Sequence, residues 1–337
     1  MIDVPLIIVL SFLICMIVFP KAISKLNSKS ITVPDIYKEN KPNIPNQGAI
    51  ITLFVSFLIC GSYPLINRLL SRIFTELDFH DFTNIDLSIL LLVSIFALYG
   101  ILDDMFHFTW TVKLVLPIFF AFPLLPYLDT IVIDLPFVGP LDLEEYYILD
   151  IKLIYLFKLL VIPVYIMVVS NLVNMHSGFN GLQSGLSLIL LLTILYKLMI
   201  DGNYESVLVS SSFLGGLFAF WFFNKYPSKI IEGNIGSQTT GALIGSLLVI
   251  NNLYIFGIMI LLIHIIDFLL FAYEKLVIKA DFRKFGSIDS DGFINPPTPF
   301  KMKFLLPYFF QMREQTVVHS CYFLTIICCI ISLMLFS

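Results

Sequence analysis

The sequence predicts an all-α integral membrane protein, a bundle of about ten transmembrane helices that forms one polytopic domain over residues 1–337. Two observations lead to this fold class. Hydrophobic residues make up 58% of the chain and charged residues 13%, against about 45–50% and about 25% in an average soluble domain. A helix needs about 20 apolar residues to cross a bilayer, and apolar runs of about this length recur along the whole chain. The composition therefore excludes a water-soluble globule, a disordered chain and a disulfide scaffold.

Ten apolar runs are the expected membrane spans. They cover residues 2–20, 49–67, 86–102, 112–128, 152–171, 185–200, 206–223, 239–252, 254–273 and 316–336. The five cysteines lie inside such runs and lack metal-ligand spacing, so we expect them to be packing residues.

Two connecting segments differ from the short loops elsewhere. Residues 129–150 alternate apolar and polar side chains around Pro136, Gly139 and Pro140, which predicts a β-hairpin on one membrane face. Residues 274–315 form the longest segment between two spans and contain several lysines and arginines. We expect this second segment to be a cytoplasmic loop.

The distribution of basic residues predicts the orientation of the bundle. Of the 20 Lys and Arg, 15 fall in the loops after the first, third, fifth, seventh and ninth spans. The exceptions are Arg68, Arg72, Lys152, Lys158 and Lys197. By the positive-inside rule those odd-numbered loops are cytoplasmic, both termini lie outside and the hairpin is on the outer face. The net charge of −4 excludes the basic footprint of a nucleic-acid-binding protein.

Adjacent carboxylates stand at the cytoplasmic end of the third span. The negative charges of Asp103 and Asp104 repel each other, and partial burial raises the free-energy cost of keeping both ionised. A nearby cation would offset this cost. Lys113 follows ten residues after Asp103 and can supply positive charge. The simpler interpretation of the two aspartates is a solvated helix end.

Two further polar segments interrupt the apolar pattern on the same side. Residues 170–185 contain Asn174 and Asn180 among three glycines, and residues 224–241 contain Glu232 and Asn234. Amide and carboxylate oxygens suit Mg²⁺, with Mn²⁺ as the alternative, or the edge of a nucleobase. Polar contacts between helices would explain the same residues without any ligand. Together with Lys113, however, the clustering favours phosphoryl chemistry between a soluble phosphorylated donor and a lipid acceptor.

Three motifs in order make the chain similar to a known family. The segments LDDMFHFTWTVKLVLP, NLVNMHSGFNGLQSG and YPSKIIEGN resemble motifs of the polyprenyl-phosphate N-acetylhexosamine-1-phosphate transferases. The resemblance is greatest to the dolichyl-phosphate GlcNAc-1-phosphotransferase branch of eukaryotes and archaea, and it extends from residue 35 to the loop near residue 283. It implies ten spans and the transfer of a sugar-1-phosphate from a UDP-sugar to a polyprenyl or dolichyl phosphate, with release of UMP. This is the first step of lipid-linked oligosaccharide synthesis.

The resemblance also implies roles for individual residues. Asp103 and Asp104 would be the catalytic carboxylates, and Lys113 would hold the pyrophosphate of the donor. The remaining residues would hold Mg²⁺ (Asn174 and Asn234), the uridine (Asn180, with backbone groups of Ile36 and Gly178) and the sugar side of the donor (Arg283, in the recognition loop at 274–315).

Departures from the family pattern keep other interpretations open. Asn234 stands where the family has a Mg²⁺-binding aspartate, so the site loses one negative charge, and Glu232 is the alternative ligand. A catalytically silent relative that binds lipid or nucleotide as a partner subunit is therefore one alternative, and a transporter is another. The expected location is the cell membrane of an archaeon, with the endoplasmic reticulum membrane as the alternative, and the default assembly is a homodimer.

Overall fold

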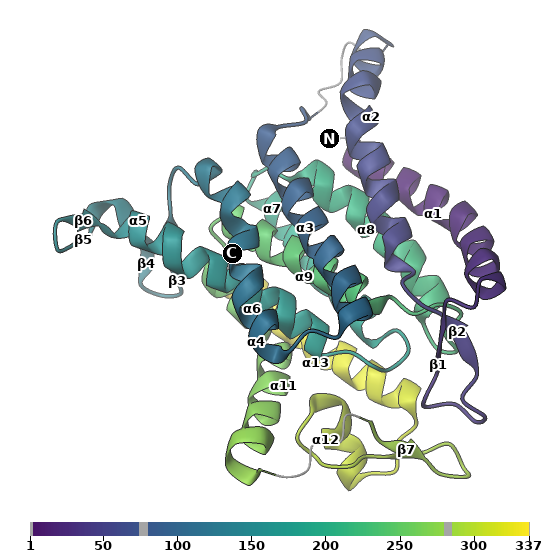
Figure 1. Cartoon of the computed structure of the whole chain (residues 1–337). Helices are drawn as coiled ribbons and strands as arrows, with labels where there is room; N and C mark the ends of the chain where they lie inside the picture. Colours follow the sequence, from purple (N-terminus) through teal and green to yellow (C-terminus); the bar gives the residue numbers. More distant parts are fainter. Residues whose placement is uncertain (1–2, 74–79, 280–284, 337) are drawn as a thin grey trace.

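A computed structural model describes residues 3–73, 80–279 and 285–336 as a bundle of long helices with small two-stranded sheets at its ends (Figure 1). The α-helices are α1 (Asp3–Ser28), α2 (Ala49–Ile73), α3 (Asn84–Phe106), α4 (Trp110–Val115), α5 (Leu153–Leu156), α6 (Ile162–Met175), α7 (Leu182–Ile200), α8 (Val207–Asn224), α9 (Gly233–Ile250), α10 (Tyr254–Ile260), α11 (Leu262–Tyr273), α12 (Met302–Phe309) and α13 (Glu314–Leu335). Other helical turns are η1 (Leu116–Tyr127), η2 (Leu143–Glu145), η3 (Phe157–Val161) and η4 (Glu274–Ile278).

The strands form four antiparallel pairs. They are β1 (Thr32–Pro34) with β2 (Asn43–Pro45), β3 (Val132–Leu135) with β4 (Gly139–Asp142), β5 (Tyr147–Ile148) with β6 (Ile151–Lys152), and β7 (Ser287–Ile288) with β8 (Ile294–Asn295). The hairpin predicted at 129–150 is confirmed as β3 and β4, in register from Val132 opposite Asp142 to Leu135 opposite Gly139. A second, shorter hairpin, β5 and β6, follows it.

All ten predicted spans are helical. By length and composition, eight helices of the described residues can cross a membrane, or nine if the pair α10 and α11, bent by 69°, is one span. The bent pair corresponds to the run predicted at 254–273. The tenth predicted run, 239–252, is α9, which is not among the helices that pass this test.

The position of α9 explains why it is less apolar than a lipid-facing span. Every residue from Ile235 to Ile250 is buried, and α9 packs against α3 and α6 along its length, with α2 and α7 beside it. A helix surrounded by protein gains from small and polar residues, which let neighbouring backbones approach closely and make hydrogen bonds between helices. Ser170 on α6 illustrates this, because its hydroxyl donates to Gln238 of α9 at 2.5 Å.

A close backbone contact of this core joins α3 to the start of α9. A Cβ atom added to Gly100 would lie 2.7 Å from the backbone oxygen of Asn234 and 2.7 Å from the Cα atom of Ile235. Because the obstructing atoms are backbone, α3 and α9 would have to separate. Gly61 on α2 has no atom within 4 Å of the same added carbon.

We expect Gly100→Ala to destabilise the protein by about 1–3 kcal/mol, the usual cost of overpacking a closely packed interior. Gly61→Ala is the matched control, and it should be neutral or slightly stabilising because alanine is the better helix former. Thermal unfolding of both purified variants checks the prediction. Equal melting temperatures for the two variants would contradict it.

The two ends of the chain lie at the same end of the bundle. Asp3 accepts hydrogen bonds from the backbone N–H of His80 at 2.8 Å and from the Tyr63 hydroxyl at 2.9 Å, just before α3 begins. Phe336 accepts one from Lys197 at 2.5 Å, near the end of α7. The opposite end carries β1, β2, α12 and the last turn of α3, so the predicted site residues lie away from both chain ends (Figure 1).

Candidate active site

A sharp reversal of the chain after α3 pairs the first carboxylate with its lysine. His107 ends the helix in the left-handed conformation, and the chain turns back into α4. The ammonium of Lys113 therefore lies 2.6 Å from Oδ2 of Asp103. The backbone N–H of Phe108 donates to the other carboxylate oxygen at 3.1 Å. Asp103 is fully buried, so the lysine and these hydrogen bonds compensate for the loss of its hydration.

The start of α9 completes the surroundings of both carboxylates. The amide nitrogen of the Asn234 side chain donates to Oδ2 of Asp103 at 2.9 Å, and the backbone N–H of Asn234 donates to Asp104 at 3.1 Å. Gly233 precedes it with φ of +72°, and an added Cβ would lie 3.0 Å from Asp104. Glycine is favoured there for both its backbone conformation and its size. Asp104 is half-buried, so it is the more accessible of the two carboxylates.

The end of α6 lines the next part of the site. The Asn171 side chain donates to the backbone oxygen of Lys113 at 3.2 Å, which fixes α4 against α6. The Asn174 side-chain oxygen accepts a hydrogen bond from Ser237 of α9 at 2.6 Å. Ser237 in turn lies 3.3 Å from the backbone oxygen of Asn234. The predicted metal-binding asparagines are therefore joined to each other through Ser237.

A second wall, the nucleoside wall, brings together the residues expected to contact the nucleoside. Tyr37, next to Ile36, packs its ring edge-to-face on Phe179 at 4.7 Å between centroids. The backbone N–H of Ser228 donates to the Asn180 side-chain oxygen at 3.1 Å. Among the described residues, the side-chain NH₂ of Asn180 has no partner, so it can donate to a ligand.

Lys303, from α12, lies against the glycine segment of this wall. Its ammonium donates to the backbone oxygen of Ser177 at 2.6 Å, and it would lie 2.6 Å from a Cβ added to Gly178. Gly178 has φ of +100°, a conformation that glycine adopts readily. This lysine belongs to the loop at 274–315, which the sequence predicts as the sugar-recognition loop, and it brings positive charge to the second wall.

Eight of the nine predicted site residues lie in these two walls. The carboxylate wall consists of Asp103, Asp104, Lys113, Asn174 and Asn234. The second wall contains Ile36, Gly178 and Asn180. Asn174, near the end of α6, lies where the two walls meet. Arg283, predicted at the sugar side, lies outside the described residues.

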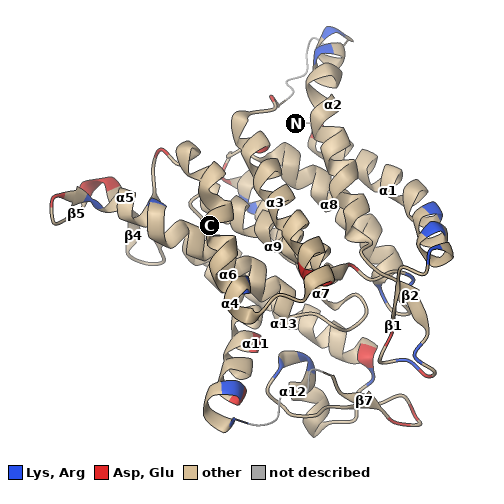
Figure 2. Cartoon of the chain, viewed as in Figure 1, with Lys and Arg blue, Asp and Glu red and all other residues tan. Residues whose placement is uncertain are grey.

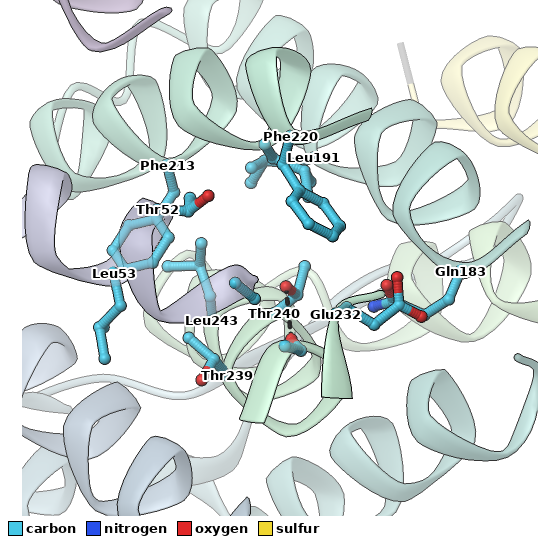
Figure 3. A pocket seen from close by; sticks show the side chains of 13 residues that line it. Thr52, Leu53, Gln183, Leu191, Phe213, Phe220, Glu232, Thr239, Thr240 and Leu243 are labelled. Carbon is cyan, nitrogen blue, oxygen red and sulfur yellow. Dashed lines mark hydrogen bonds between the residues drawn. The ribbon is translucent and has the colours of Figure 1, made fainter. Parts of the chain in front are cut away.

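Glu232, the alternative metal ligand, lines a small cavity between helices and is not part of the carboxylate wall. Its side chain lies with Gln183, Thr52 and Phe220 between α2, α7, α8 and α9 (Figure 3). The cavity volume is about 10 Å³, enough for the centre of one water molecule. The Oε2 atom is buried without a hydrogen-bond partner. Burial raises the pKa of the Glu232 carboxyl to about 8, so this side chain is neutral at pH 7.

This raised pKa predicts a pH-dependent stability. The folded protein holds a proton on Glu232 up to about pH 8, whereas the unfolded chain loses it near the ordinary value of 4.5. Stability should therefore fall as pH rises between those values. We expect Glu232→Gln to melt roughly 10 °C higher than wild type at pH 8, and no more than a few degrees higher at pH 5.

Thermal unfolding at both pH values checks this expectation. Glu145→Gln, at an exposed carboxylate of the hairpin region, is the matched control and should show no such difference. A stabilisation by Glu232→Gln that is the same at pH 5 and pH 8 would contradict a raised pKa.

The donor set at the carboxylate wall fits a magnesium ion by its chemistry. It consists of carboxylate and amide oxygens, which are the ligands Mg²⁺ prefers. Within the described ranges, no group of three or more His, Cys, Asp or Glu residues can hold a metal. The arrangement is therefore not a closed protein cage. It matches the common way in which Mg²⁺ is held by one or two carboxylates together with the phosphates of a substrate.

The structure also adds residues that sequence analysis did not select. Ser237 was hidden in a helix of many small residues, and Lys303 among other cytoplasmic lysines. Glu314 was visible as a single acid at the start of an apolar run, which is an unusual position for a charge. It is 3% exposed and accepts the backbone N–H of Asn180 at 2.6 Å.

The chain is similar to proteins of one known family. The profile of glycosyl transferase family 4 matches residues 87–252, from α3 to the end of α9. A Saccharolobus solfataricus protein is 31% identical over 290 residues, which is 85% of this chain and 81% of the relative. It carries the name UDP-N-acetylglucosamine–dolichyl-phosphate N-acetylglucosaminephosphotransferase.

Two further relatives match different shares of the chain. A Sulfolobus acidocaldarius protein with the same name is 29% identical over 294 residues, 86% of this chain and 82% of the relative. A phospho-N-acetylmuramoyl-pentapeptide-transferase of Dictyoglomus thermophilum is 28% identical over 165 residues, 47% of this chain and 50% of the relative.

The membrane-spanning helices and the family match together define a polytopic membrane transferase. The chain belongs to glycosyl transferase family 4 and is a sugar-1-phosphate transferase.

Proposed function

We propose that this protein transfers N-acetylglucosamine-1-phosphate from UDP-N-acetylglucosamine to dolichyl phosphate or a related polyprenyl phosphate, releasing UMP. The observation that carries the proposal is the pairing of Asp103 with Lys113 and Asn234 beside the nucleoside wall. The names of the two archaeal relatives support the choice of donor and acceptor. The reaction would begin the synthesis of a lipid-linked oligosaccharide.

The distribution of charge supports a cytoplasmic site. In Figure 2, Lys and Arg gather near β1, β2, α12 and the end of α1, at the same end of the bundle as the carboxylates of α3. By the positive-inside rule this end faces the cytoplasm, where nucleotide sugars are made available, and the termini face outward. The archaeal relatives favour a cell membrane over that of the endoplasmic reticulum.

The proposed reaction is a displacement at the phosphorus that carries the sugar. A phosphate oxygen of the lipid forms a bond to this phosphorus, and the bond to the oxygen bridging the two phosphates of the donor breaks. UMP leaves with that bridging oxygen. Lys113 offsets the negative charge that grows on the leaving phosphate, and Asp103 holds the lysine in place. Asp104 has the more accessible carboxylate and can take up a proton from the lipid phosphate.

Asn174, Asn234 and Asp104 would hold a Mg²⁺ ion, or Mn²⁺, together with the donor pyrophosphate. Such an ion supplies electrostatic stabilisation of the phosphate oxygens. Asn180, through its unpartnered NH₂, and the backbone beside Ile36 and Gly178 would bind the uridine. Arg283 remains the proposed contact on the sugar side.

The lipid acceptor would approach along the apolar surface next to α4. Trp110 is 65% exposed at the start of this helix, and Phe106 at the end of α3 is also 65% exposed. Lys275 places its ammonium 5.1 Å from the centre of the Trp110 ring, which adds positive charge beside the apolar side chains. An acceptor with a hydrocarbon tail and a phosphate head fits this combination.

UMP release by the purified protein tests the proposal. The assay contains UDP-N-acetylglucosamine and dolichyl phosphate, with Mg²⁺ or with EDTA, and parallel reactions omit the lipid. Release that requires both lipid and Mg²⁺ would support the proposed reaction. Release only from another UDP-sugar would replace the donor, and no release from any UDP-sugar would contradict the assignment.

A partner subunit that binds the same ligands without turnover is the second candidate. One observation favours it: the Asn234 side chain donates to Asp103, where an aspartate would add a charge for a metal. In that case the wild-type protein would bind UMP but release none, and Asn234→Asp would restore release.

A further inference from the structure

Glu314 joins three segments that are far apart in the sequence. It is the first residue of α13, and its carboxyl group is almost completely buried, with a side-chain exposure of 4%. One oxygen accepts the backbone N–H of Asn180 at 2.6 Å, and the other accepts the ammonium of Lys38. A carboxylate that bonds on both sides at this depth constrains the positions of both partners.

Each partner of Glu314 belongs to the nucleoside wall. Lys38 follows Ile36 and Tyr37 on the segment between β1 and β2, and its ammonium also lies 3.5 Å from Asp35. The same ammonium lies 4.3 Å from the centre of the Tyr226 ring. Asn180 is held on its other side by Ser228.

Packing beneath these polar contacts is continuous. Tyr37, Phe179, Leu182, Phe304 and Val317 belong to one buried cluster that unites the β1–β2 segment, the glycine segment and α13. Apolar packing of this kind brings the segments together, but it does not fix where the Asn180 amide points. The Glu314 hydrogen bond and the Ser228 hydrogen bond supply that orientation from opposite ends of the Asn180 residue.

We propose that Glu314 is a positioning residue for uridine nucleotide binding: through Asn180 and Lys38 it holds the nucleoside wall in its binding conformation. It touches neither the carboxylate wall nor Lys113, so its effect falls on donor affinity and not on the chemical step. This inference rests on the proposed function, since it takes the nucleotide of the UDP-sugar as the ligand of the wall.

Glu314→Gln tests the proposal because it keeps the shape of the side chain and removes the charge. A glutamine can accept from Asn180 only by turning its NH₂ toward Lys38, so one of the two interactions is lost. We expect the KM for UDP-N-acetylglucosamine and the Kd for UMP to rise about tenfold, equivalent to about 1.4 kcal/mol. The kcat at saturating donor and the KM for dolichyl phosphate should change less than about threefold. Glu39→Gln, an exposed carboxylate on the same segment, is the matched control and should leave all these values unchanged.

A double-mutant cycle separates positioning from general loss of structure. Lys38→Met alone should also weaken UMP binding. The double variant should lose less UMP affinity than the product of the two single effects, because both substitutions remove the same interaction between Glu314 and Lys38. If Glu314→Gln does not fold, Lys38→Met carries the test of the same interaction. Melting temperatures are measured for every variant.

UMP binding, measured by calorimetry, keeps this inference distinct from the proposed reaction. Wild-type protein that binds UMP without turnover would contradict the proposed reaction only, and a weaker Kd in Glu314→Gln would still support the positioning role. An unchanged Kd in Glu314→Gln, or a lower kcat with an unchanged KM, would overturn it. Wild-type protein that binds no uridine nucleotide would overturn both proposals.

Discussion

Asp103→Asn is expected to reduce UMP release by about 10²–10³-fold, the usual cost when a group that stabilises transition-state charge, here Lys113, is no longer held in place. The carboxylate accepts from Lys113, Asn234 and Phe108, and all three partners are donors. An asparagine has one acceptor oxygen, so its NH₂ must face at least one of these donors. Lys113 then loses its partner and its fixed position.

Lys113→Met should cause a loss of similar size, because in the proposed reaction the Lys113 ammonium offsets charge on the leaving phosphate. The double variant Asp103→Asn with Lys113→Met should be no worse than about tenfold below either single variant, since the two residues act as one unit. Initial rates of UMP release at saturating substrates measure these effects.

Asp150→Asn is the matched control for the charge change. Asp150 is exposed between β5 and β6, far from the last turn of α3, and this substitution should leave turnover unchanged. An Asp103→Asn protein that is folded and retains more than a tenth of wild-type turnover would contradict the catalytic assignment of this pair.

Asn234→Asp is expected to lower the Mg²⁺ concentration for half-maximal activity by about tenfold or more. In the wild-type protein the Asn234 side-chain NH₂ donates to Asp103, so Asn234 can give a metal one uncharged oxygen ligand. A carboxylate at this position would add a negative charge within a few ångströms of two others. Attraction to a divalent ion at such distances is worth several kcal/mol at an effective dielectric constant of about 20.

The same substitution should reverse its effect on stability when the metal is removed. With EDTA, the added carboxylate repels Asp103, and the two carboxylates share the single positive charge of Lys113, so the melting temperature should fall below that of wild type. With Mg²⁺ it should rise above it, by mass action. Asn234→Ala, which removes the oxygen without adding a charge, is the comparison and should require more Mg²⁺ than wild type. Identical Mg²⁺ titrations for all three proteins would exclude Asn234 from the metal site.

The lipid-facing helices of the bundle were more predictable from the sequence than the helices of its interior. Lipid-facing helices are recognisable because hydrocarbon admits only apolar surface, and these helices were found near their observed bounds. In contrast, the 112–128 run was predicted as a simple span, and the structure divides it into α4 and η1, where Pro117, Pro123 and Pro126 interrupt the α-helical pattern. The core helix α9 is longer at its start than the predicted run, because its first turns face protein and contain polar residues.

The candidate site shows the same division. Motif order predicted Asp103, Lys113 and Asn174 as site residues because these residue types occur at fixed spacing within single segments. It left Asn234 and Glu232 as alternatives, two residues apart. The fold separates them: Asn234 bonds to Asp103, and the Glu232 side chain lines the cavity beside Gln183.

By itself, the sequence determined the membrane bundle, the charge asymmetry of its two ends and most of the residues of the carboxylate wall. Only the tertiary structure decided which of these residues meet. Asn234 bonds to Asp103 across 131 residues, and Glu314 to Asn180 across 134. Such pairs leave no periodic signal in the chain, because they depend on how closely helices such as α3 and α9 approach. Gly100 permits this approach because it has no side chain. Hydrogen bonds between buried polar groups also stabilise it, and these bonds form only when the helices are packed.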